Sequence, residues 1–177
     1  GLNTKLHLAV DALGMPVTNA FTGDTDMWGL DFVWKWAPDG NAVAHSLKLQ
    51  AEYFHRNENG SLTFDLNGLQ DATGNYDSDQ NGWYAQAVYQ FTPRWRVGGG
   101  LNARGSDRPV GLAANSTIVA PKFITADLMA EYMLQDLSYK LSLTNVADKH
   151  YADFLYRGHY VPGKPRMLQV TAAYKFN

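Results

Sequence analysis

The sequence predicts an all-β protein, a closed antiparallel up-and-down transmembrane β-barrel of about eight strands, with residues 1–177 as a single domain. Three observations predict it. Apolar and polar side chains alternate with a period of two in successive segments of about ten residues. Long and short connections alternate along the chain, which predicts short periplasmic turns and long extracellular loops. Aromatic residues are abundant, with 5 Trp and 10 Tyr, and many lie near segment ends, as in the aromatic girdles of membrane barrels.

The alternation is clearest in residues 27–36, where Trp28, Leu30, Phe32, Trp34 and Trp36 share one face and Asp31 and Lys35 lie on the other. The predicted strands are residues 5–13, 27–36, 45–56, 83–91, 95–104, 123–134, 137–144 and 166–176. Short turns are expected at 37–41, 92–94 and 135–136, and long loops at 14–26, 57–81, 105–121 and 145–165. Closure of the barrel requires residues 5–13 to pair with residues 166–176.

Side-chain volume indicates which face points outward. A soluble barrel would hold its apolar side chains inside, but an eight-stranded interior is only just wide enough for ordinary side chains. The many aromatic rings would overfill it, whereas on the outer face they meet lipid. The predicted membrane-interface aromatics are Trp28, Trp34, Trp36, Trp83, Phe91, Trp95, Tyr174 and Phe176. The predicted interior polar network is Asp31, Lys35, Lys48, Glu52, Arg96, Asp127, Glu131, Lys140 and Lys175.

The bulk composition narrows the classes of function. The net charge of −2 gives no bias toward nucleic acid, and the absence of cysteine excludes disulfides and thiolate sites. No segment approaches the length of a membrane-spanning helix. We expect a mature chain without a signal peptide in the bacterial outer membrane. The expected partners are a lipid bilayer or detergent and the barrel assembly machinery; we expect a monomer and no cofactor.

The C-terminal third carries a family resemblance. The segments Leu141-Ser-Leu-Thr-Asn-Val-Ala-Asp-Lys-His-Tyr151, Tyr160-Val-Pro-Gly-Lys-Pro-Arg166 and the final Tyr174-Lys-Phe176 resemble the end of a TonB-dependent outer-membrane receptor. This resemblance covers about residues 121–177. Residues 1–105 more weakly resemble porin-like proteins and zinc-regulated outer-membrane receptors, through aromatic hairpins with Pro-containing turns. Resemblance of the two parts to different parents is consistent with a chimeric or designed barrel.

The resemblance implies an outer-membrane location and receptor or porin ancestry. It does not carry transport with it, because the plug and the much larger barrel of such receptors do not fit in 177 residues. Two interpretations stay open, a complete small barrel and a fragment of a larger receptor barrel. The even number of predicted strands and the regular alternation of connections favour the complete barrel. We expect a non-enzymatic scaffold or a small pore-like barrel, in which the interior charges either form a plugging network or line a conducting path. The alternative is a ligand-binding or adhesion module that acts through loops 57–81 and 145–165.

Candidate chemistry is sparse. Asp77, Asp79 and Asn81 have the spacing of the start of a calcium loop, although Val88 stands where a glutamate ligand is expected. A transition metal could be held in the last loop, where the candidate ligands are Asp148, His150, Asp153 and His159. Ser106, Asp107 and His159 lack a nucleophile-elbow signature, so no enzyme is expected.

Overall fold

A computed structural model of the chain describes residues 3–11, 13–106, 122–156 and 159–176. Strands dominate these residues, together with a short 3₁₀ helix, η1. The strands are β1 Asn3–Val10, β2 Pro16–Trp36, β3 Ser46–Phe64, β4 Ala72–Gln90, β5 Trp95–Ser106, β6 Phe123–Leu134, β7 Leu137–Thr144, β8 Ala152–Tyr156, β9 His159–Pro162 and β10 Met167–Tyr174, and η1 is Pro38–Gly40. None of the described helical segments has the length and hydropathy needed to cross a membrane.

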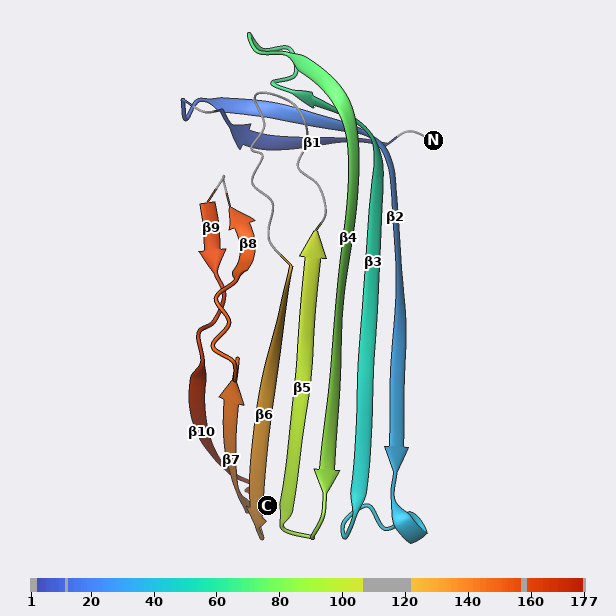
Figure 1. The fold of residues 1–177 in the computed structure, drawn as a ribbon, viewed down its shortest axis with the longest axis vertical. Coiled ribbons are helices and arrows are strands. Elements are labelled where there is room, and N and C mark those ends of the chain that lie inside the picture. The colour runs from blue at the N-terminus through green and yellow to red at the C-terminus, as the bar shows by residue number, and fades with distance from the viewer. Residues whose placement is uncertain (1–2, 12, 107–121, 157–158, 177) are drawn as a thin grey trace.

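One large sheet contains eight of the strands, in the order β1-β2-β3-β4-β5-β6-β7-β10. All neighbours in it are antiparallel, and β8 and β9 form a separate hairpin. The prediction of an all-β, antiparallel, up-and-down arrangement is therefore confirmed. Figure 1 shows long strands side by side, with short connections at the lower end.

The strand register joins the separate alternations into two continuous faces. Phe32 lies opposite Ala51, which lies opposite Ala85, and the row continues through Leu101 to Ala126. On the other side, the row from Asp31 runs through Glu52, Tyr84 and Asn102 to Thr125. Because residues directly opposite each other in antiparallel strands share a face, one face is apolar and the other polar. We call the seven strands β2–β7 and β10 the wall, and its sides the apolar face and the polar face.

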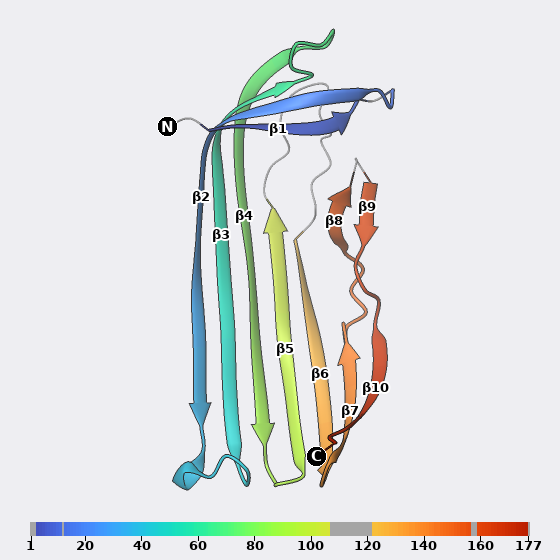
Figure 2. The ribbon, with the colours of Figure 1, turned by 180° about the vertical axis from the view of Figure 1, so that it is seen from behind.

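The first strand does not belong to this wall. β1 pairs with the first part of β2, from Asn3 opposite Gly23 to Val10 opposite Pro16. This hairpin bends away from the sheet and runs across its upper end (Figures 1 and 2). Two facing glycines occupy the bend: an added Cβ at Gly23 would lie 2.2 Å from the carbonyl oxygen of Asn59, and one at Gly60 would lie 2.3 Å from that of Thr22. The close approach of the backbones therefore requires glycine at both positions.

The prediction of a closed barrel is wrong for this structure. Among the described residues, β1 pairs only with β2 and β10 only with β7, so the expected pairing of residues 5–13 with 166–176 is absent and the sheet is open. The physical reason is the place of β1, which pairs with the upper part of β2 and bends away from the wall, so that seven strands remain. With seven alternating strands in the wall, β2 and β10 run in the same direction, and an antiparallel barrel needs an even number of strands to close.

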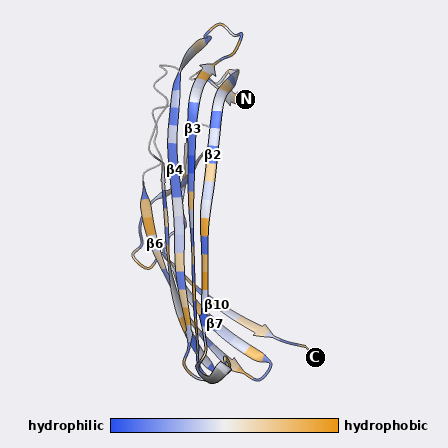
Figure 3. Ribbon diagram, turned by 90° about the vertical axis from the view of Figure 1, so that its right-hand side faces the viewer, coloured by the Kyte–Doolittle hydropathy of each residue, from blue (hydrophilic) through white to orange (hydrophobic). Residues whose placement is uncertain are grey.

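Two of the expected loops are largely strand. Residues 16–26, within the predicted loop 14–26, are the first part of β2. The predicted loop 57–81 is occupied by β3 up to Phe64 and by β4 from Ala72. Side chains on both faces of these segments are mostly polar, so they lack the alternation that marks the lower wall; Figure 3 shows this change along β2, β3 and β4. Within the expected loop 145–165 the structure places the β8–β9 hairpin.

The packed core is small and lies mainly at the bend. Val17, Ala20, Phe21 and Phe64 are buried there, and the ring of Phe21 meets that of Tyr76 edge-on with centroids 5.2 Å apart. Ala152 is the other buried apolar residue among those described. In the described part of the chain no second layer of structure covers the wall.

Candidate functional site

The apolar face of the wall is exposed across its whole width. Leu30 is 66% exposed, Phe32 56% and Leu128 54%, and Val170 on the last strand is 72% exposed. Folded soluble proteins rarely expose contiguous apolar patches larger than a few hundred Å² unless the patch binds something. This face is therefore the candidate functional surface of the molecule.

An upper group of aromatic rings borders the apolar face. Trp28 packs against Tyr53 with ring centroids 5.2 Å apart and against His55 at 5.4 Å. Tyr53 lies opposite Trp83 on the next strand. The structure thus brings the two predicted interface residues Trp28 and Trp83 to the same end, with Tyr53 between them. Tyr53 is not among the predicted interface residues, although its place in the alternation puts it on the same face.

A lower group lies near the short turns. Trp36 follows Trp34 on the apolar face of β2, and Trp95 packs against Tyr132 at 4.8 Å. Phe91 stacks with Tyr89 at 6.5 Å, and Tyr174 meets Phe176 at 4.8 Å. From Trp28 to Trp36 the strand rises about 26 Å, close to the height of about 25 Å of the apolar band of outer-membrane barrels.

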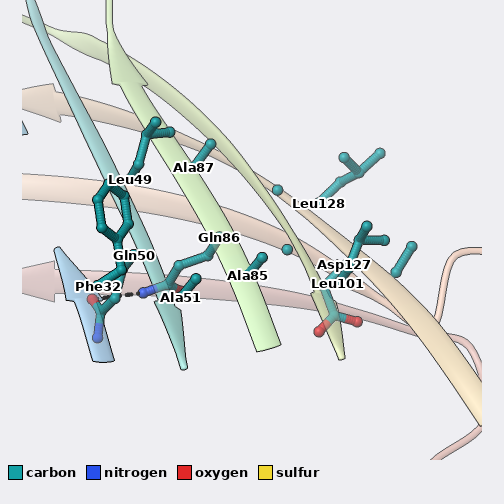
Figure 4. A pocket seen from close by; sticks show the side chains of 13 residues that line it. Phe32, Leu49, Gln50, Ala51, Ala85, Gln86, Ala87, Leu101, Asp127 and Leu128 are labelled. Atoms are coloured by element: carbon teal, nitrogen blue, oxygen red, sulfur yellow. Dashed lines mark hydrogen bonds between the residues drawn. The ribbon is translucent and has the colours of Figure 1, made fainter. Parts of the chain in front are cut away.

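Small residues hollow the apolar face between the two aromatic groups. Figure 4 shows Phe32 and Leu49 on one side of a groove, Leu101 and Leu128 on the other, and Ala85 between them. The groove has a volume of about 530 Å³, and a second groove of about 640 Å³ continues toward Leu141 and Leu168. Both linings are almost entirely apolar, so they offer contact surface and no reactive group.

The polar face holds part of the predicted interior network. Arg96 donates to Glu131 at 2.7 Å, and Lys140 lies opposite Glu131 on the following strand. Asp127 accepts hydrogen bonds from the side chain of Asn102 at 3.2 Å and from the backbone of Asn145 at 2.8 Å. Farther along the same face, Gln50 accepts from Gln86 at 3.1 Å (Figure 4) and donates to Tyr84 at 3.0 Å.

Four other network residues face like charges. Asp31 lies opposite Glu52, and Lys35 lies opposite Lys48, so like charges face each other on β2 and β3. Among the described residues, no ion pair involves any of these four side chains. Lys175 lies beyond β10, where its backbone N–H donates to the carbonyl oxygen of Asp136 at 2.8 Å.

Segments 141–151 and 160–166, which carry the family resemblance in the C-terminal third, meet at Asn145. This side chain is buried, accepts from the N–H of Lys149 at 2.8 Å, and donates to the carbonyl oxygens of Lys149 and Lys164 at 2.9 and 3.0 Å. Asp148 accepts from the backbone N–H of Arg166 at 3.0 Å. These bonds tie the end of β7 to the segment that leads into β10, which gives both motifs a structural role.

The candidate metal ligands are spread out. Asp77, Asp79 and Asn81 lie on β4 rather than in a loop, with Asp79 3.6 Å from the Nδ1 of His55. Two-residue steps along a strand place such side chains about 7 Å apart, so they do not wrap around an ion as a loop does. In the last loop, Asp148 contacts Arg166, Asp153 lies 3.8 Å from Arg104, and His150 is exposed.

Within the described residues, no group of three or more histidine or acidic side chains is arranged to hold a metal ion. The side chains of Ser106 and His159, and all of Asp107, lie outside the part that the structure describes.

Comparisons with known proteins add little to this geometry. No family model matches the chain, and no solved structure matches it. An uncharacterized protein of Aquifex aeolicus (strain VF5) is 34% identical over 80 residues. That alignment spans 45% of this chain and 15% of the relative, so the chain covers only a small part of that protein's length.

Proposed function

We propose that this chain forms part of the wall of a β-barrel in the bacterial outer membrane, with the apolar face toward lipid and the polar face toward the lumen. It acts as a non-enzymatic structural element with receptor or porin ancestry. The observation that carries the proposal is the continuous, exposed apolar face bordered by two groups of aromatic rings.

Three features support the lipid-facing orientation. Lipid covers an apolar face without a second layer of protein, which a soluble single sheet would need. The spacing of the aromatic groups along β2 suits the two interfaces of a bilayer. The Arg96–Glu131 pair and the hydrogen-bonded side chains of Gln50, Gln86 and Tyr84 suit a lumen, where polar side chains meet water or one another.

The number of wall strands favours part of a larger barrel over a complete small one. Seven strands cannot close an antiparallel barrel, so further strands complete the wall. The resemblance of residues 121–177 to the end of TonB-dependent receptors supports an origin in such a barrel, and the bonds around Asn145 are consistent with a shared structural motif.

A matched pair of substitutions tests the orientation. Phe32→Asp places a charge on the apolar face, and Val33→Asp places the same charge on the polar face one residue away. Refolding into phospholipid vesicles is followed by protease protection and by a heat-dependent shift on electrophoresis. We expect Phe32→Asp to reduce the inserted fraction severalfold, because a charge on the lipid face near the bilayer midplane costs about 2–4 kcal/mol for Lys or Arg and less for Asp. Val33→Asp should leave insertion intact.

The proposal fails if the unchanged protein stays folded and monomeric in buffer without detergent or lipid. It fails equally if the two aspartate variants insert to the same extent.

A further inference from the structure

The open edge of β2 has a defined geometry. β1 covers the upper part of β2 in unbroken register, from Val10 opposite Pro16 to Asn3 opposite Gly23. Below it, residues 27–36 of β2 pair with β3 on one side, and among the described residues no strand pairs on the other. We call residues 27–36 the β2 edge. The unpaired backbone groups of the β2 edge follow directly along the strand from the groups that pair with β1.

The β2 edge also has a charge pattern. On its polar face Asp31 and Glu52 form an acidic pair, and Lys35 and Lys48 form a basic pair. The two pairs lie about 13 Å apart along the strand, with Val33 midway between them. Like charges directly opposite each other destabilise a sheet, and each pair here lacks a counter-charge among the described residues.

We propose that the β2 edge binds an antiparallel strand that runs in the direction of β1 and continues its register. This strand carries apolar side chains opposite Leu30, Phe32 and Trp34, a basic side chain opposite Asp31 and an acidic side chain opposite Lys35. The inference deepens the proposed function and rests on it for the location of the edge in lipid, where backbone groups have no water to bind and must be paired.

Direction argues against a second copy of the sheet as the occupant. In a copy inserted with the same orientation, both edge strands, β2 and β10, run parallel to β2 of the first molecule. A strand that continues β1 runs the opposite way and meets β2 with the hydrogen-bond pattern that joins every other pair in the sheet. The occupant is therefore a strand of the β1 direction.

The charges specify the register of this strand. A basic and an acidic side chain at the stated positions neutralise both like-charge pairs at once. A slip of four residues brings like charges together, and a slip of one turns the apolar side chains to the polar face. The charge pattern thus distinguishes the proposed strand from any other apolar strand.

The absence of cysteine makes a disulfide test direct. Val33→Cys is introduced at a half-exposed position of the β2 edge. The full chain is refolded in dodecyl maltoside micelles with a synthetic strand of about ten residues. This peptide has cysteine opposite Val33, lysine opposite Asp31 and glutamate opposite Lys35. A control peptide has the lysine and glutamate exchanged, so its composition and net charge are identical.

We expect the matched peptide to form the disulfide at about five times the yield of the exchanged peptide. The preference should reverse in a Val33→Cys chain that also carries Asp31→Lys and Lys35→Glu. Gln86→Cys lies on the same face but between two paired strands, and it should form little disulfide with either peptide. Cα atoms of opposed residues lie about 4.5–5.5 Å apart, within the range of a disulfide.

Three outcomes overturn the inference. They are the absence of a disulfide with both peptides, equal yields with the two peptides, and a yield at Gln86→Cys equal to that at Val33→Cys. Vesicle insertion of the same Val33→Cys chain is measured in parallel. Insertion without selective disulfide formation contradicts this inference alone. Selective disulfide formation in micelles by a chain that does not insert contradicts the proposed function and leaves the strand-binding edge in place.

Discussion

Two buried polar side chains, Glu131 on the polar face and Asn145 just beyond β7, show how single residues hold the wall together. Both are buried, and both are fully engaged: Glu131 with Arg96, and Asn145 with backbone groups from two segments. A buried polar group that loses its partners costs more than the bond itself contributed. Substitutions at these positions should therefore cost far more than similar changes elsewhere on the same face.

Glu131→Gln tests the ion pair. We expect it to lower the free energy of unfolding by about 2 kcal/mol, because it weakens a charged hydrogen bond and leaves Arg96 without a counter-charge. Urea unfolding in detergent micelles measures the change. Glu52→Gln is the matched control on the same face; it removes a like-charge contact with Asp31 and should be neutral or slightly stabilising. Equal losses in the two variants would contradict the assignment.

Asn145→Ala tests the link between β7 and β10. We expect a loss of about 2 kcal/mol in the free energy of unfolding, since the change removes three hydrogen bonds of a buried side chain and a residue suited to its positive φ of 48°. Hydrogen exchange should also become faster in residues 145–166. Asn102→Ala removes one hydrogen bond from an exposed side chain and serves as the control. An unchanged exchange rate in residues 145–166 would rule out the proposed link.

Among the elements, the bent β1–β2 hairpin departs most from the sequence prediction. The alternation located the lower wall strands because one face is apolar and the other polar there. The upper parts of β2, β3 and β4 carry mostly polar residues on both faces, so the sequence predicts loops there. The bend depends on Gly23 and Gly60 meeting across two strands, a contact between residues far apart in the sequence. The role of Asn145 was likewise not predictable, because its partners come from a distant segment.

The glycine contact at the bend is testable. Gly60→Ala should destabilise the hairpin by about 1–3 kcal/mol, because the added methyl group meets the Thr22 carbonyl oxygen at 2.3 Å. Limited proteolysis should then cleave β1 more rapidly. Gly82→Ala is the control in β4, where the nearest atom would be 3.6 Å away, an ordinary contact. Equal cleavage of the two variants would show that the bend tolerates a side chain.

The hairpin turn should respond to pH through Asp11. Hydrogen bonds from the backbone N–H groups of Met15 and Leu13 and from Gln70 lower the pKa of Asp11 below its ordinary value of 3.8, against the effect of desolvation. Its stabilising effect is therefore present above pH 3.8 and lost as the pH falls through the lower pKa of the folded state. We expect hairpin cleavage by an acid-active protease to accelerate below that pH. Asp11→Asn should show a weaker pH dependence, and an identical profile would contradict the role of Asp11.

At the scale of the whole molecule, the two faces and the open edges are features of one continuous sheet. The apolar face is continuous over seven strands, whereas the small packed core lies mainly at the bend. The sequence could predict the apolar face, because its alternation is local. Closure could not be predicted in the same way, since it depends on the number and directions of the wall strands and on which strand β1 pairs with. The structure shows a wall with two open edges and one exposed apolar face, and we propose that this face meets lipid.

Depth-resolved fluorescence quenching tests this account most directly. The 5 native tryptophans are replaced by phenylalanine, and a single tryptophan is introduced at Phe32 or at Val33. Vesicles contain lipids brominated at different depths of the acyl chain. If the apolar face meets lipid, bromines near the bilayer centre should quench the Phe32→Trp protein strongly and the Val33→Trp protein much less. Equal quenching at the two positions, or quenching of neither, would contradict it.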